Sequence, residues 1–186
     1  MASPPTDDRA WQAELACVRV SPDDFDLSEE VARLRHADPQ VGAVVSFVGT
    51  VREWREAAGA SGADATMELE HYPGMTERSL AELIVRARQR FDVRGIRVVH
   101  RVGPLRVQEQ IVLVVVTSAH RQAAFDCAAY LMDWLKTQAP FWKKESAGGH
   151  SRWVDARVSD DEAVRRWGEP GVAPMSPSST HTKGPA

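Results

Sequence analysis

Cysteine is scarce in this sequence, which has 186 residues and only two cysteines, Cys17 and Cys127. They lie far apart and form no CxxC pair, so neither a disulfide scaffold nor a cysteine zinc site is expected. No histidines show the HExxH spacing of a catalytic metal site, and P-loop, GxGxxG and GxSxG motifs are missing as well. We therefore expect reduced thiols, no metal and no cofactor of the protein's own.

Long apolar runs and an excess of basic charge are also missing. The longest apolar run, Ile111–Val116, is far shorter than the roughly 20 residues that span a bilayer. The first ten residues are polar and lack the basic-then-apolar order of a signal peptide. The net charge is -3, so no global positive field favours nucleic acid. We expect a cytoplasmic protein that binds neither membrane nor nucleic acid.

The composition indicates a single folded unit, because 43% hydrophobic and 26% charged residues are ordinary values for a globular domain of this length. We expect a flexible leader over 1–12 and a folded domain over 13–167. The segment 168–186 is rich in Pro, Gly, Ser and Thr and is expected to be a disordered tail.

Strand and helix signals alternate irregularly along the folded unit, which predicts an α+β fold. Strands are expected at 41–51, 67–71, 96–102, 110–118 and 152–158. The apolar run within 110–118 predicts that both faces of that strand are covered. A loop is expected at 52–65 and a turn at Gly103-Pro104. One helix is expected after Thr76, taken as its cap, and a second from about Ser118 to Pro140. Ser159 and Glu162 form a capping-box signature for a short final helix.

The most informative stretch for chemistry surrounds three lysines near the end of the second long helix. Lys136 falls in its last turn, and Lys143 and Lys144 follow Pro140. Lysines at a helix C-terminus commonly complement the helix dipole, which is the simpler reading. The neighbouring Phe141-Trp142 instead favours a partly desolvated site, in which a lysine loses affinity for its proton and becomes a usable base or nucleophile.

Other cationic side chains fall at strand ends. His120 and Arg121 lie where a buried strand passes into a helix, and the free N–H groups there favour an anion. A capping histidine and a solvated arginine are the alternatives. Arg52 and Arg157, each near a strand end, could face the same region. His71, His100 and Arg101 are interpreted as structural, and Cys127 as packing. These residues indicate either an enzyme with reactive lysines and anionic substrates or a passive phosphate-binding module.

Five blocks of the sequence resemble the large, catalytic subunit of molybdopterin synthase: VGAVVSFVGTVR (41–52), LEHYPGMTE (69–77), HRVGPL (100–105), VTSAHRQAAF (116–125) and YLMDWLKTQAPFWKKE (130–145). They occur in the family's order with compatible spacing. Two departures are visible: Gln138 stands where many relatives carry arginine, and Gln108 stands where a turn glycine is common.

The resemblance implies a mixed, largely antiparallel sheet with packed helices, similar to an α/β-hammerhead. It implies a sulfurtransferase that converts cyclic pyranopterin monophosphate to molybdopterin. The sulfur comes from the C-terminal Gly-Gly thiocarboxylate of a small ubiquitin-like subunit, within a heterotetramer built on a homodimer. Lys136 and Lys143 match the family's active-site lysines. Substrate contacts match Thr50, Val51, Arg52, His120, Arg121, Lys144, Glu145 and Arg157. The alternative is a non-catalytic module that binds a ubiquitin-like partner or a phosphorylated ligand.

Overall fold

The computed structural model describes residues 7–36, 38–53, 66–137, 139–147, 150–154 and 166–168. Within these ranges the chain forms four helices and eight strands. In chain order they are α1 (Asp8–Ala16), β1 (Val18–Ser21), α2 (Leu27–Arg35), β2 (Ala43–Thr50), β3 (Thr66–His71), α3 (Met75–Arg90), β4 (Gly95–Arg101), β5 (Gly103–Arg106), β6 (Gln110–Ser118), α4 (Arg121–Thr137), β7 (Phe141–Ala147) and β8 (His150–Val154).

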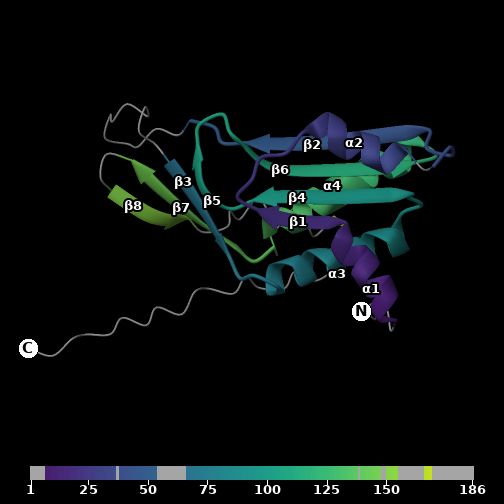
Figure 1. Ribbon diagram of the computed structural model, residues 1–186, viewed down its shortest axis with the longest axis horizontal. Coiled ribbons are helices and arrows are strands. Elements are labelled where there is room, and N and C mark those ends of the chain that lie inside the picture. The colour runs from purple at the N-terminus through teal and green to yellow at the C-terminus, as the bar shows by residue number, and fades with distance from the viewer. Residues whose placement is uncertain are drawn as a thin grey trace, which may run out of the picture.

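The strands form two four-stranded sheets, which lie end to end in Figure 1. The first sheet has the order β1-β4-β6-β2, and the second has the order β5-β3-β7-β8. Among the eight described strands only β1 and β4 pair in parallel, and the other neighbours are antiparallel. The expected α+β fold with a mixed, largely antiparallel sheet is confirmed.

Strand β6 lies inside the first sheet, and helices cover both of its faces. Val112, Val114 and Val116 pack with α3 and α4 in the largest apolar cluster. Leu113 and Val115 point the other way, into a smaller cluster with residues of α2. Alternate side chains of a strand face opposite sides, so a continuous apolar run is what a doubly covered strand requires. This prediction is confirmed.

The start of α3 differs from the expected cap. Gly74 is the N-cap residue, and its N–H donates to the Glu77 carboxylate at 2.6 Å. Thr76 lies inside the first turn of α3 and is fully buried. Its hydroxyl accepts from the Tyr72 N–H and donates to the Pro140 carbonyl, each at 3.3 Å. Thr76 therefore links this turn to a distant segment, and the expectation that it caps the helix is wrong.

Several boundaries differ from those expected. Residues 8–12, assigned to a flexible leader, are helical in α1, which Asp7 caps through the Arg9 N–H. Gly103, with a φ of 80°, begins β5, so the expected turn is the point where the chain passes into the second sheet. Strand β7 was not expected. The last strand among the described residues is β8 (His150–Val154), and residues 155–158 of the expected strand lie outside them. The capping-box residues Ser159 and Glu162 of the expected final helix, and most of the loop at 52–65, lie outside the described residues.

No helix among the described residues has the length and apolar character needed to cross a membrane.

Candidate active site

Lys143 and Glu145 lie on the same face of β7. Successive side chains alternate between the faces of a strand, so Phe141, Lys143 and Glu145 share one side. The Lys143 Nζ lies 2.6 Å from a Glu145 carboxylate oxygen, the geometry of an ion pair. The Glu145 side chain is 8% exposed and that of Lys143 is 38% exposed. Glu145 is therefore held behind an accessible lysine.

The end of β2 packs against this same face. Val51 is buried in a cluster with Met67, Leu69 and Leu105. Met67 lies opposite Glu145, and Leu69 lies opposite Lys143, in the β3–β7 pair. Directly opposed residues of an antiparallel pair share a face, so Val51 and the lysine pack on one side of the second sheet. The exposed Arg52 follows directly. The structure thus brings the Thr50–Arg52 segment and Lys143 together.

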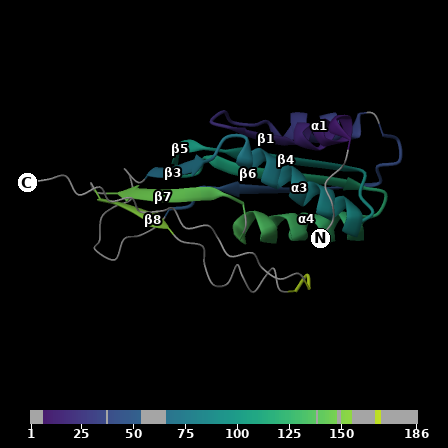
Figure 2. The same cartoon turned by 90° about the horizontal axis from the view of Figure 1, so that it is seen from below.

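Lys136 lies at the same end of the molecule, on the C-terminal turn of α4. It is exposed in the last turn of α4, between the buried Leu135 and Thr137. Figure 2 shows β7 beginning beside the end of α4. No side-chain ion pair of Lys136 is found within the part of the chain that the structure describes. Lys136 and Lys143 therefore flank a short connection, one as an exposed amine and the other as a paired amine.

His120 and Arg121 lie at the opposite end of α4. Ser118, at the end of β6, pairs with Ala43, whereas Gln110, at its start, pairs with Thr50. The 17 residues of α4 rise by about 25 Å, so they carry the chain from His120 back to the lysines across that distance. Both side chains are exposed. Within one chain, His120 and Arg121 therefore do not converge with Lys136, Lys143 and Arg52.

Two other expected site residues fall elsewhere. Lys144 alternates onto the opposite face of β7, where its amine lies 3.6 Å from Glu68 and 5.9 Å from the centre of the Trp153 ring. It therefore lies on the other side of the second sheet from Lys143. Arg157 lies outside the described residues, as does Gln138.

The residues interpreted as structural are buried or paired. His100 stacks on Phe141 with ring centres 3.8 Å apart. Burial lowers the pKa of His100 to about 4, so the ring is neutral at pH 7. Burial also raises the pKa of the Cys127 thiol to about 12, which removes it as a nucleophile. Among the described residues, no group of three His, Cys, Asp or Glu side chains could hold a metal ion.

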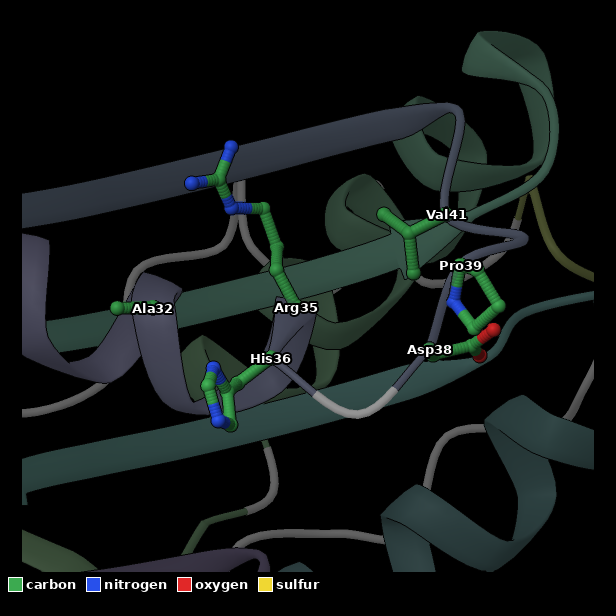
Figure 3. Close-up of a pocket in the computed structure, with 6 residues that line it drawn as sticks. All are labelled: Ala32, Arg35, His36, Asp38, Pro39 and Val41. Atoms are coloured by element: carbon green, nitrogen blue, oxygen red, sulfur yellow. The ribbon is translucent and has the colours of Figure 1, made fainter.

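A surface crevice of about 380 Å³ lies away from the lysines. It is found at the end of α2 and before β2 (Figure 3), and its lining consists of Ala32, Arg35, His36, Asp38, Pro39 and Val41. The neighbouring Gly42 N–H donates to the Ser118 carbonyl at 3.0 Å, so the crevice lies near the His120 end of the fold. The lining carries both positive and negative side chains, and Asp38 accepts a hydrogen bond from Arg94. The crevice therefore has no clear preference for a ligand of one charge.

Sequence reasoning missed the partnership of Glu145 with Lys143, because the stretch after Pro140 was not recognised as a strand. The strand signal there is weak, because Phe141-Trp142 is followed by Lys143-Lys144-Glu145 and the stretch shows no alternation of apolar and polar residues. Thr76 contacts Pro140, and His100 contacts Phe141. No local sequence pattern predicts these two contacts, because they join segments about 40 to 64 residues apart.

Known proteins share this sequence and this fold. Residues 20–138 match the family described as MoaE protein. The molybdopterin synthase catalytic subunit of Ralstonia nicotianae is 54% identical over 154 residues, which cover 83% of this chain and 85% of that protein. Molybdopterin cofactor biosynthesis protein E from Burkholderia multivorans has a TM-score of 0.69 at 49% identity, over 83% of this chain and 97% of that chain.

A more distant structure, molybdopterin synthase from Staphylococcus aureus, has a TM-score of 0.66 at 28% identity, over 75% of this chain and 97% of that chain. The similarity therefore extends through both sheets and the helices that cover them, and includes the segments that carry Lys136 and Lys143. This chain belongs to the MoaE protein family, whose curated relatives are the catalytic subunits of an enzyme, molybdopterin synthase.

Proposed function

We propose that this protein is the sulfurtransferase subunit that converts cyclic pyranopterin monophosphate to molybdopterin, with sulfur from the C-terminal thiocarboxylate of a small ubiquitin-like subunit. Family membership supports the assignment, and the name of the curated relatives, a catalytic subunit, implies at least one further subunit. The observation that carries the proposal is the gathering of Lys136, Lys143 and Arg52 at one end of the fold, where no cysteine nucleophile lies among the described residues.

Two anionic reactants must meet in such a site, since the pterin carries a phosphate and the donor tail carries a thiocarboxylate. Like charges about 4 Å apart repel by about 1 kcal/mol in water and by several times more in a drier site. Arg52 and Lys143 would offset this repulsion. Because the sulfur arrives on the partner, a cysteine in this chain is not required.

The two lysines are assigned different roles. Lys143 is paired with Glu145, so we assign it to the stabilisation of negative charge that develops during transfer. Lys136 is exposed and has no ion pair within the described residues, so we assign it to attack or proton transfer at the reacting groups. Glu145 acts through Lys143 in this scheme and does not contact the substrate.

The separation of His120 and Arg121 from the lysines supports a homodimer at the centre of the assembly. β2 is an edge strand of the first sheet, and Phe47 on β2 and Phe125 on α4 are exposed. A two-fold axis across β2 would place the His120 end of one chain beside the Arg52 end of its copy, because a two-fold contact reverses the direction of the strand. Each lysine site would then receive His120 and Arg121 from the second copy. With one small subunit bound at each outer end, the assembly is a heterotetramer, which we place in the cytoplasm.

The reaction itself is tested with the purified chain, cyclic pyranopterin monophosphate and the partner in its thiocarboxylate form. We expect a dithiolene product with that partner and none with the same partner ending in an ordinary carboxylate. A stable complex that forms no product from the thiocarboxylate would show a passive binding module instead.

The shared site is tested by mixing two variants that we expect to be inactive on their own, Lys136→Ala and Arg121→Ala. If each site combines Lys136 of one copy with Arg121 of the other, a mixed dimer has one intact site. Random exchange of subunits should then restore about a quarter of the wild-type activity. If each site is built within one chain, every site in the mixture carries a substitution, and activity stays absent.

A further inference from the structure

We propose that Thr76 and His100 are positioning residues, which hold the connection between α4 and β7 and thereby fix Lys136 relative to Lys143. This inference rests on the proposed sulfur-transfer function. The connection ends at Pro140 and Phe141, and each of these two residues is held by a buried side chain from a different part of the fold.

Thr76 holds the backbone of the connection. Its side chain is fully buried, and its hydroxyl donates to the Pro140 carbonyl at 3.3 Å. The same hydroxyl accepts from the Tyr72 N–H at 3.3 Å, so its direction is fixed from both sides. A valine would fill the same volume without these bonds. The polar side chain at this position therefore does something that packing alone would not require.

His100 holds the first side chain of β7. The imidazole lies nearly parallel to the Phe141 ring, at 15° and 3.8 Å between centres. Its Nδ1 lies 2.8 Å from the Arg101 carbonyl, and because a carbonyl only accepts, this nitrogen carries the proton. The neutral ring is thus tied to its own strand in the first sheet. Because the Phe141 ring stacks on this imidazole, Phe141 is held in a fixed place as well.

The position of Phe141 decides where Lys143 lies. The two residues are on one face of β7, separated by a single residue, so a shift of the strand start moves the lysine by a similar distance. At the other end of the connection, the Thr137 hydroxyl donates to the Asp133 carbonyl at 2.9 Å, which closes the last turn of α4 beside Lys136. The positions of both amines are therefore fixed by rigid elements, Lys136 by α4 and Lys143 by β7. Catalytic groups need such support, because small misplacements are costly.

The test compares Thr76→Val with Thr76→Ser, and uses Thr66→Val, at an exposed position of β3, as the matched control. Turnover and KM for the pterin are measured with the thiocarboxylated partner, together with hydrogen exchange along the chain. For Thr76→Val we expect kcat to fall about ten- to a hundredfold with KM changed less than about twofold. Exchange should become faster mainly at 139–147. Thr76→Ser should keep kcat within about threefold of the wild type, since it keeps the hydroxyl.

Two results would overturn the inference. The first is a Thr76→Val enzyme with the wild-type kcat. The second is a Thr76→Val enzyme whose lower kcat comes with faster hydrogen exchange throughout the protein, together with an equally low kcat for Thr76→Ser. Should Thr76→Val fail to fold, Phe141→Leu, which removes the ring stacked on His100, decides by the same criteria. An inactive wild-type protein would instead refute the proposed function, so the two failures are distinguishable.

Discussion

The Lys143 amine and the Glu145 carboxylate lie 2.6 Å apart on one face of β7, with the carboxylate buried and the amine reaching the surface. A buried carboxylate needs a cation or hydrogen-bond donors, because its desolvation is costly. Lys143 meets that need and is restrained in return. The arrangement gives the candidate active site one cation with a fixed position.

Glu145→Gln keeps the shape of this side chain and removes its charge. We expect the free energy of unfolding to fall by about 1 kcal/mol, since Lys143 is partly exposed and water replaces some of the lost interaction. Turnover should fall at least tenfold, because a less restrained amine stabilises the developing charge less well. Urea denaturation and single-turnover assays measure the two effects. Glu68→Gln, which breaks the more exposed pair with Lys144, is the control, and equal turnover in the two variants would contradict the account.

Neither cysteine should be needed for sulfur transfer. Burial raises the pKa of Cys127 to about 12, so in the folded protein a thiol reagent should modify the half-buried Cys17 well before Cys127. A double variant, Cys17→Ser with Cys127→Ala, should keep at least about half of the wild-type rate per folded molecule. Loss of activity in a double variant that is shown to be folded would mean that a thiol of this chain carries the sulfur.

The buried His100 should make stability depend on pH. Its folded-state pKa of about 4 lies below the unfolded value of 6.5, so the unfolded chain binds a proton first as the pH falls. The stabilisation is present above pH 6.5 and is lost as the pH falls toward 4. Between pH 7 and pH 5 the free energy of unfolding should drop by about 2 kcal/mol from this group. His100→Phe, which keeps an aromatic ring against Phe141, should show a drop smaller by that amount in urea titrations. Equal drops would refute the assignment of a neutral buried ring.

Gln108 has a φ of 75°, the only positive φ at a non-glycine residue within the described ranges. Its N–H donates to the Val51 carbonyl at 2.7 Å, so the turn that it forms supports the end of β2. A side chain beyond Cβ gains nothing from this conformation, which glycine adopts freely. Gln108→Gly should raise the free energy of unfolding by up to about 1 kcal/mol in urea denaturation, and Gln108→Ala should leave it nearly unchanged. A glycine variant less stable than the alanine variant would contradict this reading.

Much of the first sheet could be predicted from the sequence because its signals are local. Strand β6 is covered on both faces, and its sequence is therefore a continuous apolar run. Helices α3 and α4 each bury one face, and their apolar residues therefore recur at helical spacing. Residues 8–12, the first part of α1, fall in the expected leader because this helix buries no residue, and a surface helix of that kind has little apolar periodicity. Strand β7 was missed because two lysines and a glutamate interrupt its apolar pattern.

In the candidate site, too, some features could be predicted from local sequence signals and others could not. Lys136 and Lys143 were singled out because a specific string of residues carries them, and the structure places both at one end of the fold. The face on which each lysine lies could not be predicted, since placing Lys143 and Lys144 on opposite sides of the second sheet requires the β3–β7 register. The separation of His120 from Lys136, by contrast, follows from the helix already expected between about Ser118 and Pro140, because a helix of that length holds its two ends about 25 Å apart.

The most direct test of the account is the sulfur-transfer activity of Lys136→Ala with the thiocarboxylated partner. Lys136 is exposed, so the variant should fold and bind the partner as the wild type does. We expect product formation to fall by about a hundredfold or more, the loss typical of a missing acid–base group or nucleophile. A folded, partner-bound Lys136→Ala protein that keeps most of the wild-type activity would contradict the central claim.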